Sequence, residues 1–302
     1  MVTDTKKLSQ RLQLNLAGLK ASESFADFPL QVPESFVARI KPGDINDPLL
    51  LQVLPQEQEL QETPGFVTDP LAEKNSSPVP GVIHKYLDRV LLLVSDVCAI
   101  NCRFCFRRHS QDKISDWQKV FAYIKRHPDI SEIILSGGDP LMLEPNDLIA
   151  IIEKLAEISH IKRLRIHSRT PIVMPERVLP DLTQTRLPII LVVHCNHPNE
   201  INADVEGVIS ALRHKGIIIF NQSVLLRGIN DNADVLIALS EKLFNAGVLP
   251  YYLHMLDQVK GAAHFYVEKD QAKQIYLEMQ KRLPGYLVPK LVFEVQGRKT
   301  YV

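Results

Sequence analysis

The sequence predicts an α/β protein built as an open or partial barrel of parallel strands with helices outside. Six apolar, strand-like segments recur along the chain, and segments with helical periodicity lie between them. Several of the strands are apolar almost throughout, which is expected when both faces of a strand are buried. No dinucleotide-binding glycine fingerprint follows the first strand, so a partial barrel is favoured over a doubly wound sheet.

The expected strands are RVLLLVSD (89–96), SEIILSGGD (131–139), KRLRIHS (162–168), LPIILVVH (187–194), GIIIFNQS (216–223) and PYYLHML (250–256). Helical periodicity marks residues 117–127, 146–159, 175–182, 203–216 and 232–247. Upstream lies proline-rich chain with two expected short helices, at residues 8–21 and 34–40. We therefore expect an N-terminal extension over 1–84, the barrel over 85–260, and a C-terminal segment over 261–302 that covers the barrel mouth.

Composition excludes several classes of protein. The 35 Lys and Arg residues balance 35 Asp and Glu residues, whereas dedicated nucleic-acid binders usually carry a basic excess. The longest apolar runs, such as LPIILVV, are too short to span a bilayer, and the first residues do not resemble a secretory signal. Three of the four cysteines fall within eight residues, which indicates a metal site in a reducing cytoplasm. We expect a cytoplasmic protein without membrane or nucleic-acid partners.

The segment CAINCRFCFRRH (98–109) holds Cys98, Cys102 and Cys105 with the spacing C-x3-C-x2-C. Three thiolates suit an iron–sulfur cluster that keeps one iron open for another molecule. His109 could complete a Cys3His zinc site, although structural zinc ligands usually come from two separated knuckles. Three unrelated buried cysteines are a further alternative, which the arginine-rich setting disfavours. Cys195 has no partner at ligand spacing and is expected to be a small buried apolar side chain.

Polar residues follow the expected strands at the points where each strand ends. They are SGGDP (136–140), HSR (167–169), HCNHPNE (194–200), NQS (221–223) and Asp257. In barrels, the loops after the carboxyl ends of the strands form the active face. The sequence therefore predicts one common site near the cysteines.

The cysteine motif, placed after the first strand of a six-unit barrel, resembles the radical S-adenosylmethionine (SAM) superfamily. The segments HKYLDRVLLLVSDVCAINCRFCFRRH, SGGDPLM, RIHSRTP, HCNHPNEI, NQSVLLRGIND and GVLPYYLHMLD together resemble the lysine 2,3-aminomutase family. They are most similar to the subgroup that forms (R)-β-lysine for modification of elongation factor P. PGFVTDPL, GAAHF and GYLVPKL extend the resemblance over nearly the whole chain. The resemblance implies a radical SAM partial (β/α)6 barrel and an isomerase that converts L-lysine to (R)-β-lysine.

The resemblance also implies a [4Fe–4S] cluster on the three cysteines, with SAM on the open iron and an external electron donor. Glycine suits a SAM site because a backbone without Cβ atoms can approach the ligand closely. The residues that match the SAM site of the family are Ser136, Gly137, Gly138, Asp139, His194 and Gln222.

Members of the family use pyridoxal phosphate (PLP), and the lysine that holds PLP at rest matches Lys299. Arg89, and less clearly Lys85, match positions that could hold the phosphate. The loop before Lys299 is about two residues shorter than is usual in the family, so a radical SAM protein that has lost PLP remains an alternative. The family's C-terminal zinc-binding cysteines are absent from this sequence, so no zinc is expected.

The substrate is L-lysine by resemblance, and three residues match the positions that bind it. Arg107 matches the arginine that pairs with the substrate carboxylate, and Asp257 and Glu294 match the two carboxylates that bind the ε-ammonium group. An aminomutase for another amino acid and a zinc module that binds RNA are the competing hypotheses. The sequence leaves a homo-oligomer open.

Overall fold

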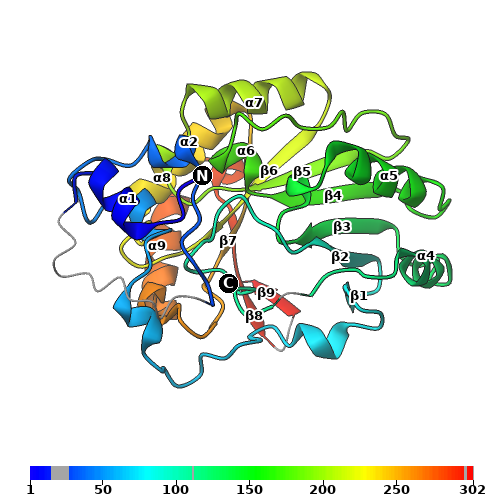
Figure 1. Cartoon of the computed structure of the whole chain (residues 1–302), viewed down its shortest axis with the longest axis horizontal. Helices are drawn as coiled ribbons and strands as arrows, with labels where there is room; N and C mark the ends of the chain where they lie inside the picture. The colour runs from blue at the N-terminus through cyan, green and yellow to red at the C-terminus, as the bar shows by residue number, and fades with distance from the viewer. Residues whose placement is uncertain (15–26, 111, 296–297, 302) are drawn as a thin grey trace.

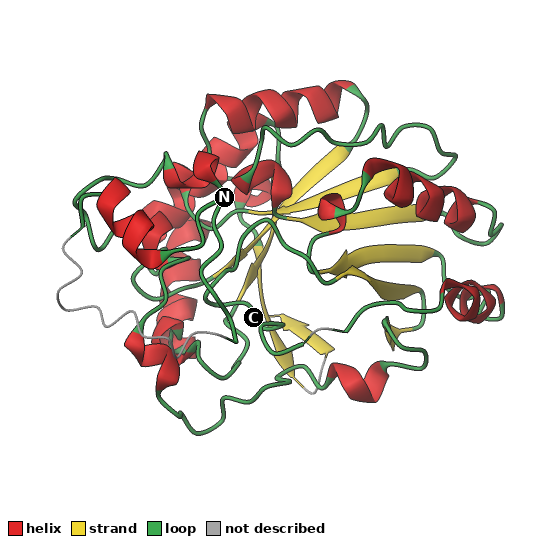
Figure 2. Cartoon of the chain, in the orientation of Figure 1, coloured by secondary structure: helices red, strands yellow, loops and turns green. Residues whose placement is uncertain are grey.

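The computed structural model describes residues 1–14, 27–110, 112–295 and 298–301, and the side chains of residues 295–299 lie outside the description. Its centre is one nine-stranded sheet whose order follows the chain from β1 to β9 (Figures 1 and 2). β2 to β8 are parallel, whereas β1 and β9 pair antiparallel to their neighbours. The strands are β1 Val82–Tyr86, β2 Arg89–Ser95, β3 Glu132–Gly137, β4 Arg163–Ser168, β5 Ile189–His194, β6 Ile218–Val224, β7 Leu249–His254, β8 Lys290–Val295 and β9 Arg298–Tyr301.

The predicted α/β class and partial barrel are confirmed. The six expected strands are β2 to β7, and within the described residues the sheet does not close on itself. β8 adds a seventh parallel strand that the sequence pattern did not predict. It pairs with β7 from Tyr252 to His254, so part of the C-terminal segment belongs to the sheet.

The helices between the strands lie on the outer face of the sheet (Figure 1). The longer ones are α4 Trp117–Lys125, α5 Pro145–Ala156, α7 Ala203–His214, α8 Ala233–Ala246 and α9 Lys269–Arg282; short turns follow at η4 Pro140–Met142, η5 Pro198–Glu200, η6 Ala263–Phe265 and η7 Gly285–Leu287. Asp116, Asn202 and Asn232 cap the starts of α4, α7 and α8 by accepting backbone N–H bonds. None of the described helices combines the length and the apolar content needed to cross a membrane.

The helix expected over residues 175–182 is wrong. The helical turn there is α6 Thr170–Val173, and the chain after it is irregular up to β5. Pro175 and Pro180 explain the difference, because proline lacks an N–H donor and restricts the residue before it. The apolar spacing of this segment resembled a helix, but its backbone cannot continue one.

The N-terminal extension packs on the barrel and shares its core. It contains α1 Thr5–Arg11, α2 Glu34–Val37, α3 Pro48–Leu51, η2 Glu57–Leu60 and η3 Glu73–Ser76. Leu8, Phe36 and Leu49 are fully buried in the same apolar cluster as residues of the strands. α1 covers part of the first expected helix, and residues 15–21 of that expectation lie outside the described residues. Because it is packed in this way, the extension can place side chains next to the site.

Candidate functional site

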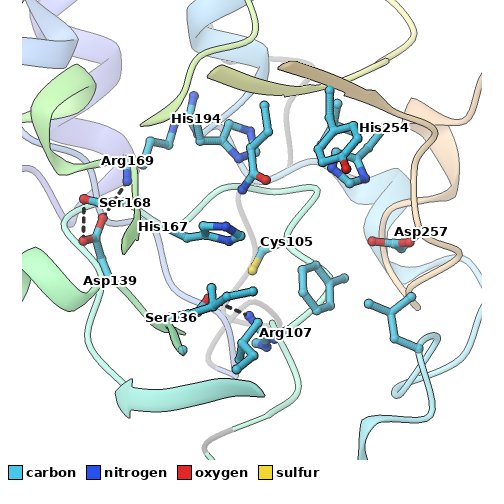
Figure 3. Close-up of a pocket in the computed structure, with 18 of the residues that line it drawn as sticks. Cys105, Arg107, Ser136, Asp139, His167, Ser168, Arg169, His194, His254 and Asp257 are labelled. Carbon is cyan, nitrogen blue, oxygen red and sulfur yellow. Dashed lines mark hydrogen bonds between the residues drawn. The ribbon is translucent and has the colours of Figure 1, made fainter. Parts of the chain in front are cut away.

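A cavity of about 610 Å³ lies within the curve of the sheet, a volume typical of small-molecule sites. It reaches from the carboxyl ends of the strands, where the cysteines lie, to their amino ends, where Arg89 and Lys290 begin β2 and β8. Figure 3 shows part of its lining, with Cys105 near the centre. Apart from Lys299, every predicted site residue lines it: Lys85, Arg89, Cys98, Cys102, Cys105, Arg107, Ser136, Gly137, Gly138, Asp139, His194, Gln222, Asp257 and Glu294.

The three cysteines present free thiols to this cavity. Burial, followed by the charges of Cys105 and Asp139, raises the pKa of Cys98 far above its usual value. Burial and the neighbouring Cys102 raise the pKa of Cys105 to about 11. The thiols therefore keep their protons, because deprotonated sulfurs would repel one another across a small space; iron ions would remove both that repulsion and the protons. This donor set fits a cluster.

His109 is the candidate fourth ligand of a Cys3His zinc site. In the part of the chain that is described, no three His, Cys, Asp or Glu side chains converge closely enough to hold one metal ion. His109 is exposed, and its Nε2 lies 3.0 Å from the Lys260 carbonyl oxygen. A [4Fe–4S] cluster binds each cysteine through a different iron, so its sulfur ligands stand further apart than those around zinc.

A buried ion-pair network supports the cysteine loop from behind. Arg103 is fully buried, and its Nε and Nη2 donate to the Glu59 carboxylate at 2.9 and 2.5 Å. Arg108 donates to the same carboxylate at 2.7 Å. Glu59 comes from η2 in the extension, so this network fixes the loop to the N-terminal part of the chain. Removing one partner of such a buried pair leaves an uncompensated charge and is strongly destabilising.

Arg169 is a site residue to which the sequence analysis gave no role. It is 7% exposed, and its Nη1 donates to the Cys102 sulfur at 2.6 Å. Its Nη2 donates to Gln52 at 2.5 Å and to Glu200 at 2.9 Å. Burial by itself would lower the pKa of Arg169, but the charges of Cys102 and Glu200 outweigh burial and raise it. A permanent positive charge therefore touches one sulfur of the cysteine set.

Gly137 and Gly138 line the cavity, but their lack of Cβ atoms serves the fold. Gly137 has φ +117°, and a Cβ there would collide with the Ser95 carbonyl oxygen. A Cβ at Gly138 would lie 2.5 Å from the Val97 carbonyl oxygen. The glycines thus let the end of β3 close against the backbone that leads into the cysteine motif. Both glycines also line the cavity, so their prediction as part of a SAM site stays a prediction.

Asp139 organises two neighbouring loops. Its carboxylate accepts from the Ser168 hydroxyl at 2.7 Å and from the backbone N–H groups of Arg169 and Thr170 at 2.8 and 3.0 Å (Figure 3). Burial raises its pKa. These bonds place Arg169 beside Cys102, so Asp139 acts on the cavity through the loop that follows β4.

His194 and Gln222 lie opposite each other at the ends of β5 and β6. The His194 ring stacks on Phe104 with 5.6 Å between centroids. Burial, followed by the charge of Arg169, lowers the pKa of His194 to about 3, so the ring is neutral. Its Nε2 is buried and makes no hydrogen bond within the described residues. An unpartnered buried polar atom on a residue that lines the cavity fits a site for a polar ligand.

Hydrogen bonds to protein groups already occupy part of the Arg107 guanidinium. Its Nε and Nη2 donate to the Glu73 carboxylate at 3.0 and 2.6 Å, and its Nη1 donates to Ser136 at 3.3 Å. Burial would lower the pKa of Arg107, but Glu73, and more weakly Cys105 and Asp257, raise it. No role was predicted for Glu73, although it lies two residues after the segment PGFVTDPL.

Glu294 lies in β8, and Asp257 lies in the loop that follows the neighbouring strand β7. Val292 of β8 pairs with His254 of β7, and the two carboxylates follow this pair by three and two residues. Both line the cavity. Glu294 lies 3.7 Å from the Lys85 ammonium, which also donates to the Leu71 carbonyl at 3.0 Å. Lys85 is therefore directed at Glu294.

The remaining predicted cofactor residues lie towards β1 and β9. Arg89 donates to Asp88 at 2.8 Å, and its guanidinium lies 4.0 Å from the centre of the Tyr86 ring. The backbone of Lys299 pairs with Glu294 across β8 and β9, and its side chain lies outside the described residues. Cationic side chains at the amino ends of β2 and β8 fit a phosphate group.

Comparison with known proteins defines the class first. Residues 92–239 match the family model of the Radical SAM superfamily. A radical SAM methyltransferase from Sphaerobacter thermophilus has a similar fold, with a TM-score of 0.50 over 70% of this chain and 68% of that chain at 16% identity. The cavity and its cysteines thus lie in a radical SAM barrel.

Relatives over nearly the full length narrow the class. The chain is 48% identical to L-lysine 2,3-aminomutase of Escherichia coli, over 98% of this chain and 90% of the relative. It is 49% identical to the enzyme of that name from Buchnera aphidicola, over 91% of this chain and 84% of the relative. Identity to the Clostridium subterminale enzyme is 38%, over 87% of this chain and 65% of the relative. The chain belongs to the L-lysine 2,3-aminomutase family.

Proposed function

We propose that the protein is a radical SAM, PLP-dependent isomerase that converts L-lysine to (R)-β-lysine. One observation carries the proposal: the same cavity is lined by three thiols, by Arg107, by Glu294 of β8 and by Asp257, which follows the neighbouring strand β7. Thiols suit the cluster, and the charged groups are complementary to the two ends of lysine. We further propose that the product serves the modification of elongation factor P, which the sequence resemblance supports, and that the enzyme works in the reducing cytoplasm.

Cys98, Cys102 and Cys105 would hold a [4Fe–4S] cluster, with SAM on the open iron and an external donor supplying the electron. When bound, the reduced cluster and SAM supply a carbon radical that removes a hydrogen atom from the substrate. Arg169 would stabilise the negative charge of the cluster through Cys102. His194 and Gln222 would line the SAM site as neutral polar groups, and Asp139 would keep Arg169 in place.

PLP would be held through Lys299, with Arg89 near its phosphate. When bound, PLP supplies the conjugated system through which the amino group migrates. The backbone of Lys299 pairs with that of Glu294, so the lysine lies beside the strand that carries a predicted substrate carboxylate. This supports retention of PLP despite the shorter loop.

Charge would select the substrate. Asp257 and Glu294 each attract an ammonium group by about 4 kcal/mol at 4 Å and an effective dielectric of about 20, before desolvation is counted. Arg107 would bind the α-carboxylate through the N–H groups that Glu73 does not occupy. The Lys85 ammonium lies 3.7 Å from Glu294, which shows that this carboxylate already attracts one ammonium group.

A substrate panel tests this proposal. The protein, loaded with cluster and PLP, is incubated without oxygen with SAM, a reductant and L-lysine, L-ornithine or L-glutamate. We expect a kcat/KM for L-lysine at least about tenfold above that for L-ornithine, because a shorter side chain cannot reach both carboxylates. L-glutamate should not react, and Lys299→Ala should convert none of the three. Preferred conversion of another amino acid would assign the cavity to that substrate.

A further inference from the structure

Glu73 stands apart from the predicted site because it comes from the extension and not from a strand. It begins η3, yet it lines the cavity and pairs with Arg107 through two hydrogen bonds. The side chains of Arg107 and Glu73 are only 13% and 16% exposed. An ion pair at this depth is screened weakly by solvent, so it holds its geometry better than a surface pair does.

The chain around Glu73 is built to hold it there. Ala72 has φ +48°, a left-handed conformation that a residue with a side chain adopts only when its surroundings require it. Asp69 accepts from the Glu73 N–H at 3.0 Å, and the Lys85 ammonium donates to the Leu71 carbonyl at 3.0 Å. Hydrogen bonds thus hold the turn to β1 through Lys85 and to its own first residues through Asp69.

The pair leaves a defined part of Arg107 for a ligand. Glu73 occupies the edge formed by Nε and Nη2, and Ser136 accepts one bond from Nη1. A guanidinium has five N–H groups, and these bonds to the described residues use three of them. Nη1 and Nη2 together form the end of the guanidinium at which a carboxylate binds in the bidentate manner.

Asp257 is an alternative carboxylate partner for Arg107. Asp257 lines the same cavity, and its charge acts on Arg107 (Figure 3). Glu73 and Asp257 are both carboxylates whose charges raise the pKa of Arg107, and Glu73 has the larger effect. An Arg107–Asp257 pair would take both groups away from a substrate, because one would bind its carboxylate and the other its ammonium.

We infer that Glu73 is a positioning residue for substrate specificity: it holds Arg107 towards the substrate carboxylate and away from Asp257. The inference rests on the proposed function, which assigns Arg107 and Asp257 to the two ends of lysine. Glu73 and the substrate carboxylate also repel each other across the guanidinium. The two effects have opposite signs in a Glu73→Ala variant, because loss of the holding role weakens L-lysine binding and loss of the repulsion strengthens it.

Equilibrium binding tests the inference. Dissociation constants for L-lysine and for lysine methyl ester, which lacks the carboxylate charge, are measured on cluster- and PLP-loaded protein without reductant. Glu73→Ala should weaken L-lysine binding about tenfold or more and bring the two constants close together. Glu73→Asp should restore part of the preference for L-lysine. Glu62→Ala, an exposed carboxylate paired with Lys260, should change neither constant.

The opposite result has a clear meaning. If Glu73→Ala or Glu73→Gln binds L-lysine as tightly as the unaltered protein does, or more tightly, Glu73 competes with the substrate and the inference is wrong. Glu73→Gln provides this answer if the alanine variant fails to fold. Arg107→Gln separates the two proposals: if it keeps the preference for L-lysine over the ester, the assignment of Arg107 fails, whatever Glu73 does.

Discussion

Replacing any one of Cys98, Cys102 and Cys105 by serine should abolish the iron–sulfur cluster and reduce SAM cleavage at least about a hundredfold. The three thiols share one cavity, and each would bind a different iron, so the loss of one leaves an incomplete set. Serine keeps the size of the side chain but is a far poorer ligand for iron than thiolate. Iron and sulfide content with the visible absorption spectrum measures the first effect, and 5'-deoxyadenosine released per protein measures the second.

Cys195 provides the matched control within the same chain. It is fully buried, its sulfur lies 3.5 Å from the His197 carbonyl oxygen, and its backbone N–H donates to Asn221. Burial raises its pKa well above the usual value, so it remains a thiol. Cys195→Ser should therefore keep the full iron content. Loss of the cluster in this variant, or zinc in place of iron in the unaltered protein, would contradict the assignment.

Asp257→Asn and Glu294→Gln should each lower kcat/KM for L-lysine by about ten- to a hundredfold. If these carboxylates bind the ε-ammonium group as proposed, each change removes one charge-assisted contact, typically about 1.5–3 kcal/mol, and alters side-chain volume very little. The carboxylates follow paired positions of β7 and β8, so both can face one cation. The double variant should show coupling, because the two groups act on the same charge.

The kcat/KM values can be compared only between variants with equal cluster and PLP content. Cluster and PLP content are measured in every variant, and Glu278→Gln, an exposed carboxylate on α9 paired with Lys281, controls for loss of charge. Unchanged kcat/KM in both single variants would remove Asp257 and Glu294 from the substrate site. Additive effects in the double variant would mean that the two carboxylates act on different groups.

The strands of the barrel could be predicted because their apolar runs are long and are separated by helical segments. β8 was missed because the short run KLVFEV stands alone after α9, with no further strand–helix unit to mark it. The false helix at 175–182 arose because apolar spacing alone ignores the prolines that interrupt it.

Site residues could likewise be predicted near strand ends but not in irregular chain. Residues at strand ends, such as Asp257 and His194, could be placed because parallel strands bring their carboxyl ends together. Glu59, Glu73 and Gln52 could not be placed, because they come from irregular chain whose position depends on tertiary packing. Glu73 meets Arg107 across 34 residues and Gln52 meets Arg169 across 117, with no periodic pattern between them. Only the folded structure shows that the N-terminal extension supplies these partners.

Product identification tests the central claim most directly. L-lysine labelled with ¹⁵N at its α-amino group is incubated without oxygen with the loaded protein, SAM and a reductant, and the products are separated by chiral chromatography and mass spectrometry. The account predicts (R)-β-lysine with the label on the carbon next to the original α-carbon, formed only when SAM, PLP and the reductant are all present. Recovery of unchanged L-lysine from protein with full cluster and PLP occupancy, or β-lysine formed without SAM, would contradict it.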